Sequence, residues 1–246
     1  MLDQGLVFGL RRALGLAVNV RRFTGLAGGD VMVVRENSEG LYFAPGTVLH
    51  AGTDAAIATE VAVTSYAAAE RCVRTAFETA RERGRRVTLA HKVNVLVASG
   101  SVWTQALRAV EPEFPDVAAR VENVDTCCLR LVQDPARYDV IVTDNVFGDV
   151  VADVACAALD AFAYSASAEY GPVTSLFEPI HGPQDGVGDP HPVSVVAAVR
   201  AAALLASHVG HDDAARLLDE AALTAARDPG SDPLETVRCL ASAATA

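Results

Sequence analysis

Two aspartates in the middle of the chain have a spacing that could hold a metal ion. Asp149 and Asp153 are four residues apart in the segment 147–159, whose pattern predicts a helix, so both carboxylates fall on one helix face. Clustered carboxylates repel each other unless a cation lies between them, and hard oxygen ligands favour Mg²⁺ or Mn²⁺. The alternative is that these acidic side chains only complement the helix dipole near its N-terminus.

Basic residues and a tyrosine could supply further chemistry. Arg11, Arg21 and Arg35 could each bind a carboxylate through two parallel hydrogen bonds, although for any one of them a solvated surface is the simpler interpretation. Lys92 is the one lysine among 20 basic residues. A desolvated amine can lose its proton, whereas a guanidinium stays charged, so this lysine is either a base or a chance survivor on the surface. Tyr42 lies in a predicted loop and is either an acid or a packed ring.

Strands and helices must bring these side chains together. Three short β-branched runs, 31–34, 87–90 and 140–143, have the length of strands covered on both faces. The apolar spacing over 59–83 predicts a helix between the first two, and such alternation predicts an α/β fold. Polar residues follow each run directly. We expect them at one sheet edge, because ligands of open α/β sheets bind outside the carboxyl ends of strands.

The composition excludes several classes of protein. The chain has 246 residues and a formal charge of −11, which argues against a nucleic-acid binder. Apolar runs are shorter than the ~20 residues that span a bilayer. The five cysteines are odd in number and form no CxxC pair, which indicates a reduced, cytoplasmic protein rather than a zinc site or a disulfide framework.

Six sequence blocks occur in an order that is typical of one family. They are LRRALGLAVNVR (10–21), RENSEGLY (35–42), HKVN (91–94), VDTCCLRLV (124–132), DVIVTDNVFGDVVADV (139–154) and LFEPIHG (176–182). Together they resemble the isocitrate/isopropylmalate dehydrogenase family. The resemblance implies that family's two-domain α/β fold, with the large domain incomplete at its N-terminus. It places 1–20 and 160–246 in the remnant of the large, cofactor-side domain, and 21–159 in a small domain for substrate, metal and dimerisation.

The resemblance also implies an activity and a set of site residues. The activity is NAD(P)-dependent oxidative decarboxylation of a 2-hydroxy dicarboxylic or tricarboxylic acid of the isocitrate, homoisocitrate, isopropylmalate or tartrate type. Lys92 would help to remove the hydroxyl proton, and Tyr42 would return a proton after CO₂ loss. The lysine and one aspartate would come from a neighbouring subunit, so a homodimer is implied. The implied ligands are the substrate-binding Arg11, Arg21 and Arg35, the Mg²⁺- or Mn²⁺-binding Asp125, Asp149 and Asp153, and the cofactor-binding Asn94, Glu178, His181, Gly182 and Asp185.

Departures from the family pattern leave two hypotheses open. Family chains begin before the position of Met1, and the segment after His181 is shortened, although Asp185 there favours NAD over NADP. In one hypothesis the chain is an enzyme whose remaining part comes from a second chain or an upstream start. In the other it is a non-catalytic partner or regulatory subunit that binds substrate and metal but not cofactor. Lys92 and Tyr42 favour the enzyme, and the altered nucleotide loop favours the binding subunit.

Overall fold

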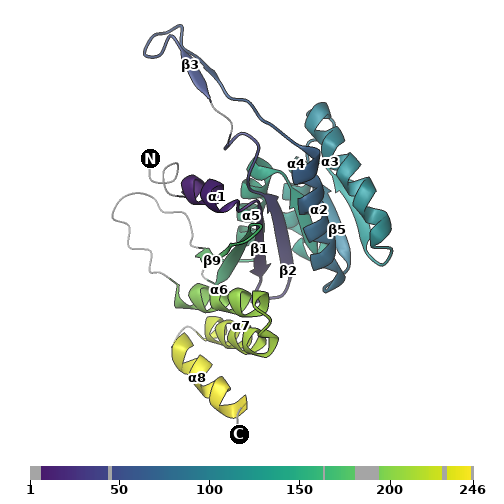
Figure 1. The fold of residues 1–246 in the computed structure, drawn as a ribbon. Coiled ribbons are helices and arrows are strands. Elements are labelled where there is room, and N and C mark those ends of the chain that lie inside the picture. The colour runs from purple at the N-terminus through teal and green to yellow at the C-terminus, as the bar shows by residue number, and fades with distance from the viewer. Residues whose placement is uncertain (1–6, 44–45, 163, 181–193, 229–231, 245–246) are drawn as a thin grey trace.

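A seven-stranded mixed sheet forms the centre of the molecule, in the strand order β6-β5-β7-β2-β1-β8-β9 (Figure 1). The computed structural model describes residues 7–43, 46–162, 164–180, 194–228 and 232–244. Strands β6, β5, β7 and β2 are parallel, whereas β1, β8 and β9 pair antiparallel. The strands are β1 (Val18–Thr24), β2 (Asp30–Glu36), β5 (Arg86–Ala90), β6 (Ala118–Glu122), β7 (Val140–Thr143), β8 (Ser165–Tyr170) and β9 (Ser175–Ile180).

Helices cover both faces of this sheet. Helices α2 and α3 enclose one core and α4 and α5 another on the opposite face, while α6 packs on β8 and β9 and α7 packs on α6 (Figure 1). All four residues of β7 are buried because the strand is covered on both sides. The helices are α1 (Phe8–Leu14), α2 (Tyr66–Arg81), α3 (Val97–Val110), α4 (Val124–Gln133), α5 (Asn145–Ala158), α6 (Val195–His208), α7 (Asp212–Arg227) and α8 (Pro233–Ala244), with 3₁₀ turns at Glu111–Glu113 and Pro135–Arg137.

The three predicted strands are confirmed as β2, β5 and β7, and the helix around the paired aspartates is confirmed as α5. The helix predicted over 59–83 begins later than expected. Ser65 caps it by accepting a hydrogen bond of 3.2 Å from the Ala68 amide, so α2 starts at Tyr66. Thr59 belongs instead to a separate strand, and residues 60–65 have no regular secondary structure.

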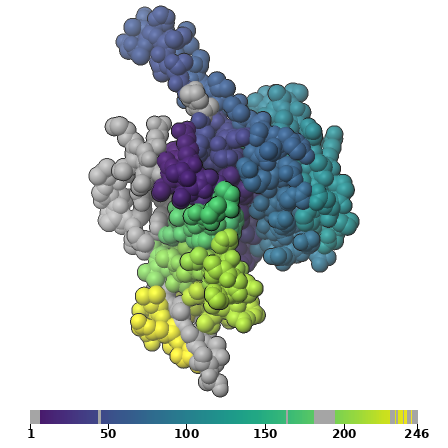
Figure 2. All heavy atoms as spheres, viewed as in Figure 1, coloured from purple at the N-terminus to yellow at the C-terminus, as the bar shows by residue number. Residues whose placement is uncertain are grey.

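That strand is part of an arm, residues 46–60, that projects from the body of the molecule (Figures 1 and 2). Strands β3 (Thr47–Leu49) and β4 (Ile57–Thr59) form a two-stranded antiparallel ribbon in which every residue is exposed. A lone two-stranded ribbon is marginally stable in water. The arm therefore depends on support beyond its own two strands.

The central sheet crosses both proposed domain boundaries. Strand β1 spans the boundary at 20/21 and pairs with β8, which lies beyond the boundary at 159/160. The division into 1–20 with 160–246 and 21–159 stays a prediction. Among the described residues, none of the helices is long and apolar enough to cross a membrane.

Candidate functional site

The carboxyl ends of β2 and β7 lie side by side and begin the candidate site. These strands are parallel, with Arg35 opposite Thr143, so the residues that follow each strand emerge at one edge. Asp144 caps α5 by accepting a hydrogen bond of 2.8 Å from the Phe147 amide. This cap fixes the start of α5, and the first turns of the helix place Asp149 next to Arg35.

A row of polar residues crosses the antiparallel half of the sheet. Asn19 on β1 is registered against Arg35 on β2 and against Glu169 on β8. Two residues along β1, Arg21 is registered against Ser167, and Ser167 against Glu178. Directly opposed residues have their Cβ atoms about 4.5–5.5 Å apart. The register therefore brings Arg21 and Arg35, the substrate-binding candidates on β1 and β2, near Glu178, the cofactor candidate on β9.

Arg35 is held rigidly in this arrangement. Its Nε and Nη2 donate to Asn145 Oδ1 at 3.1 and 2.8 Å, and its Nη1 pairs with Asp149. The side chain is 2% exposed, and burial lowers its pKa to about 10, with the charge of Asp149 opposing this change and the nearby Arg21 adding to it. Gly148 allows this approach, because a Cβ there would lie 2.6 Å from Arg35 Cγ.

Asp149 is the meeting point of several predicted site residues. Besides Arg35, it receives a hydrogen bond of 3.2 Å from the Tyr42 hydroxyl and lies 3.5 Å from Arg21 Nη2. Burial and the Asp149 carboxylate raise the pKa of Tyr42, so this phenol keeps its proton near neutral pH. Burial and Asp149 also raise the pKa of Asp153, which shows that the two carboxylates lie within electrostatic reach of each other.

Lys92 and Asp125 form a separate pair. Lys92 Nζ donates to Asp125 Oδ1 at 2.7 Å, and this contact lowers the pKa of Asp125, whose side chain is 63% exposed. Within the described residues, no group of three His, Cys, Asp or Glu side chains is close enough to bind a metal ion. Asp125 is thus not gathered with Asp149 and Asp153 inside one chain. The Asp149–Asp153 pair offers two hard oxygen donors that suit Mg²⁺ or Mn²⁺, and the third expected donor must come from elsewhere.

Arg11, the third substrate-binding candidate, is occupied by an internal partner. Its guanidinium donates to both carboxylate oxygens of Glu169, and the amides of Asn19 and Asn37 donate to the same carboxylate. The predicted carboxylate-binding geometry therefore exists at Arg11, but the carboxylate that fills it belongs to the protein.

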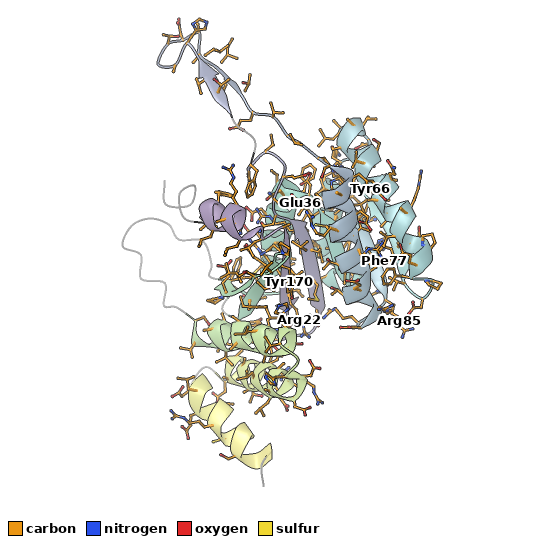
Figure 3. All side chains as sticks on the ribbon, viewed as in Figure 1. Arg22, Glu36, Tyr66, Phe77, Arg85 and Tyr170 are labelled. Carbon is orange, nitrogen blue, oxygen red and sulfur yellow. The ribbon has the colours of Figure 1, made fainter. Side chains whose placement is uncertain are left out.

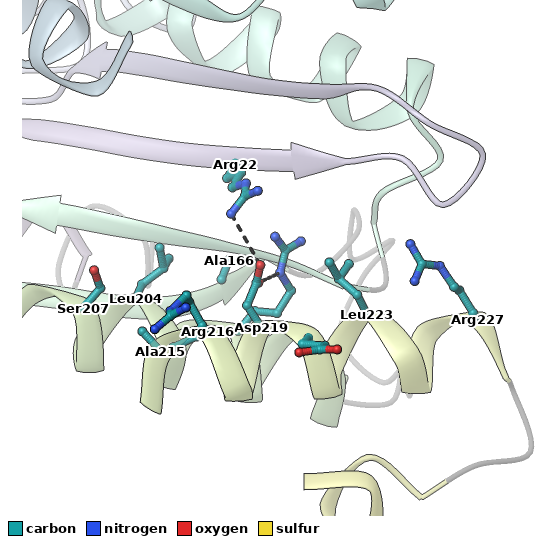
Figure 4. A pocket seen from close by; sticks show the side chains of 12 residues that line it. Arg22, Ala166, Leu204, Ser207, Ala215, Arg216, Asp219, Leu223 and Arg227 are labelled. Atoms are coloured by element: carbon teal, nitrogen blue, oxygen red, sulfur yellow. Dashed lines mark hydrogen bonds and ion pairs between the residues drawn. The ribbon is translucent and has the colours of Figure 1, made fainter. Parts of the chain in front are cut away.

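Two of the cavities within the described residues lie beside the sheet. One, of about 430 Å³, is lined by Glu36, Asp144, Asn145 and Trp103, and lies beside the polar edge. The larger, of about 520 Å³, lies under Arg22 between the sheet and α6–α7, and its walls include Asp219, which pairs with Arg22 (Figure 4). Figure 3 shows Arg22 far along the β1–β2 pair from Glu36. The larger cavity is thus at the opposite end of these strands from the candidate site.

Comparisons with known proteins identify the family of this chain. A model of the isocitrate/isopropylmalate dehydrogenase family matches residues 4–233. The chain belongs to this family. It is 37% identical over 249 residues to the 3-isopropylmalate dehydrogenase of Corynebacterium urealyticum, and 40% identical over 239 residues to that of Rhodococcus jostii. It resembles the solved isocitrate dehydrogenase of Methylococcus capsulatus with a TM-score of 0.83 at 30% identity.

The matches to the isocitrate/isopropylmalate dehydrogenase family cover nearly all of this chain but not all of its relatives. They include 96%, 92% and 96% of this chain in the three comparisons, against 74%, 70% and 75% of the respective relatives. The family resemblance and the α/β fold expected from the sequence blocks are therefore both confirmed. The fold covers most, but not all, of an isocitrate dehydrogenase chain.

The roles of the individual site residues within this dehydrogenase fold stay predictions. Asn94 is exposed on the turn after β5, and Glu178 is half-buried on β9, where burial and the charge of Glu169 raise its pKa. His181, Gly182 and Asp185 lie outside the described residues. The sequence analysis did not single out Glu169 or Asn19. The alternation of polar residues in 165–170 could have predicted a strand there. The pairing of Glu169 with Arg11 could not have been predicted, because the two residues are 158 positions apart in the sequence.

Proposed function

We propose that this chain takes part in the NAD-dependent oxidative decarboxylation of a 2-hydroxy acid with at least two carboxylates, in the cytoplasm. The observation that carries the proposal is the convergence of Arg21, Arg35 and Tyr42 on Asp149, one helical turn before Asp153. Two guanidiniums suit two carboxylate groups, and the paired aspartates suit a divalent cation. A tyrosine hydroxyl beside them suits the return of a proton to carbon.

The chemistry of the substrate assigns roles to these side chains. Arg21 and Arg35 bind and orient the carboxylates, and Lys92 removes the proton of the hydroxyl group. After CO₂ leaves, Tyr42 delivers a proton to the carbon that carried it. Its raised pKa favours the protonated form that this step needs. Mg²⁺ or Mn²⁺, held by Asp149 and Asp153 with Asp125, supplies polarisation of the substrate's oxygen atoms when bound. NAD, assigned to Asn94, Glu178 and the segment that contains His181, Gly182 and Asp185, supplies the hydride acceptor.

A second copy of the chain completes the proposed site. Lys92 and Asp125 pair with each other apart from Asp149, so one chain presents two complementary parts of a site. A two-fold dimer would bring the Lys92–Asp125 part of one protomer to the Asp149–Asp153 part of its partner, twice. Exposed apolar side chains along α4 and α5 provide a surface for such an interface: Leu129, Val132 and Val150.

Turnover and binding must be measured separately to test this proposal. We expect the purified chain with Mn²⁺ and NAD to produce NADH from at least one of malate, 3-isopropylmalate, isocitrate, homoisocitrate and tartrate. Calorimetry with the same acids shows whether they bind. Binding without turnover would support a non-catalytic subunit instead of the enzyme, and absence of both binding and turnover would contradict the proposal.

A further inference from the structure

We propose that the cavity of about 430 Å³ beside the polar edge of the sheet binds a small organic ammonium ion that has an apolar body and a neutral hydrogen-bond acceptor. Its walls come from the end of β2 and from α2, α3 and α5. Neither the arginines nor the paired aspartates of the candidate site line it, so it is a second site. Its volume falls within the range of about 300–1,000 Å³ that is typical of sites for small molecules.

Three carboxylates line this cavity, and the groups that donate to them are neutral. Glu36 accepts hydrogen bonds from the amide and hydroxyl of Ser38 and from the amide of Glu39. Glu39 in turn accepts from the amide of Ser65 at 2.7 Å and from its hydroxyl at 2.6 Å. Asp144 accepts from a backbone amide in the first turn of α5. These donors orient the carboxylates and leave their charges in place.

The three carboxylates also lack a permanent cation. Within the part of the chain that the structure describes, no arginine or lysine forms an ion pair with any of them. His91 Nε2 lies 3.5 Å from Asp144 Oδ2, but a histidine is a cation only when it is protonated. Burial raises the pKa of Glu36, and the charge of Glu39 adds to this rise while the hydrogen bonds from Ser38 and Glu39 oppose it. Negative charge that neutral donors leave uncompensated favours a cationic ligand.

A buried indole gives an independent indication of a ligand. Trp103 lines the cavity and is 1% exposed, and its Nε1 has no hydrogen-bond partner among the described residues. An indole N–H is only a donor, so an acceptor on the ligand would satisfy it. That acceptor must be neutral, because a carboxylate would meet three like charges. The rings of Trp103 and Phe147, which also lines the cavity, can attract an ammonium ion through their faces.

The lining residues differ in exposure in a way that suits an apolar body. Glu36 and Trp103 are at most 3% exposed, whereas Val63, Val95 and Val97 are 54%, 63% and 67% exposed. An ammonium group placed among the buried polar atoms leaves the rest of the ligand against these valines, where it removes apolar surface from water. A bare metal ion fits less well, since no three His, Cys, Asp or Glu side chains of the described residues are close enough to bind one.

Phenylalaninol is a suitable probe, because it combines an ammonium group, a hydroxyl group and an apolar ring. Three related compounds each change one feature. 3-Phenylpropan-1-ol lacks the ammonium group, phenethylamine lacks the hydroxymethyl group, and the free amino acid phenylalanine has a carboxylate in place of the hydroxymethyl group. Binding of all four to the full chain would be measured by isothermal titration calorimetry at pH 7, without hydroxy acid, metal or NAD.

The four compounds should bind in a defined order. Phenylalaninol should bind with a Kd of about 1 mM or lower, and phenethylamine at least about threefold more weakly. The uncharged alcohol and the amino acid should bind at least about tenfold more weakly than phenylalaninol. Absence of phenylalaninol binding at millimolar concentration, or equal binding of the alcohol or the amino acid, would overturn the proposal.

A charge substitution with a matched control locates the site. Glu39→Gln keeps a side-chain acceptor for Ser65 and removes one negative charge from the cavity, so it should weaken phenylalaninol binding at least about fivefold. Glu220→Gln removes a negative charge from the wall of the larger cavity and should leave the affinity within about twofold of the wild type. Equal effects of the two substitutions would show that the amine responds only to net charge and would overturn the proposal.

A second variant tests the indole separately. Trp103→Phe keeps an aromatic ring but removes the N–H group, so it should weaken phenylalaninol at least about threefold and leave phenethylamine within about twofold. An unchanged ratio between these two ligands would overturn the role of the indole as a donor to the ligand. Thermal melting by circular dichroism shows whether each variant is folded. If a variant is not folded, the order of the four compounds on the wild type still decides.

Discussion

Gly148→Ala should disturb the candidate site through a single methyl group. The added Cβ would lie 2.6 Å from Arg35 Cγ and 2.8 Å from Arg35 Cβ, closer than carbon atoms can approach. Arg35 cannot move aside easily, because it is almost fully buried and donates two hydrogen bonds to Asn145. Overpacking of this kind costs about 1–3 kcal/mol, and the better helix propensity of alanine returns up to about 1 kcal/mol. We expect a net loss of about 1–2 kcal/mol.

Two measurements check this expectation. For a chain of this size, 1 kcal/mol lowers the melting temperature by about 2–4 °C, so the variant should melt at least ~2 °C below the wild type. Displacement of Arg35 from Asp149 should also weaken the binding of malate at least about tenfold, equivalent to ~1.4 kcal/mol.

The chain offers a matched control for the same substitution. Gly9 also lies inside a helix, α1, and a Cβ there would have no atom within 4 Å. Gly9→Ala should leave malate binding unaltered and should not lower the melting temperature. If Gly148→Ala behaves like Gly9→Ala in both measurements, the close packing of α5 on Arg35 does not constrain the site, and the reasoning is refuted.

Three further substitutions test other parts of the structure. Asp149→Asn/Asp153→Asn should abolish Mn²⁺ binding measured by calorimetry in the presence of malate, and equal affinity in both proteins would exclude these ligands. Lys92→Arg should reduce turnover at least about 100-fold with an unchanged melting temperature, because a guanidinium cannot act as a base near neutral pH, and a comparable rate would remove Lys92 from the chemistry. Burial disfavours the charged form of Asp30, but its hydrogen bonds and ion pairs with Arg22 and Arg83 together outweigh this and lower its pKa in the folded state. The ion pair thus stabilises the protein above the unfolded pKa of about 4, and the contribution is lost as pH falls through the lowered folded pKa. Asp30→Asn should cost about 1 kcal/mol at pH 7. Its melting temperature should fall less between pH 7 and pH 3 than that of the wild type, and an equally large fall in the variant would contradict this role.

Local pattern was sufficient for the parallel half of the sheet. Strands β2, β5 and β7 are continuous apolar runs because helices cover both of their faces, and such runs are visible without any knowledge of their neighbours. The four-residue spacing of Asp149 and Asp153 likewise places both on one face of α5 wherever that helix lies. The predicted start of the helix over 59–83 was wrong because Val61 and Val63, which precede Ser65, are exposed and lie between the arm and α2.

The antiparallel half could not be predicted in the same way. Its strand β1 carries Asn19, Arg21 and Arg22, and its strand β8 consists of small residues with Glu169, so neither shows the apolar pattern of a buried strand. Asn19 donates to Glu169 across the sheet, and Arg21 and Arg22 pair with Asp149 and Asp30, so protein partners take the place of solvent. A periodicity argument sees only neighbours along the chain and misses such compensation.

The sequence by itself determined the family, the α/β alternation and the residue types available for chemistry, because these depend on short blocks whose residues act within one turn or one strand. The tertiary structure alone decided which of those residues meet. Arg11 and Glu169 are 158 positions apart and become partners only through the pairing of β1 with β8. Lys92 and Asp125 are drawn together at β5 and β6, apart from Asp149 on α5. Strand register and strand order are set by long-range packing, and they determine whether a charged side chain is available to a ligand or already neutralised by the protein.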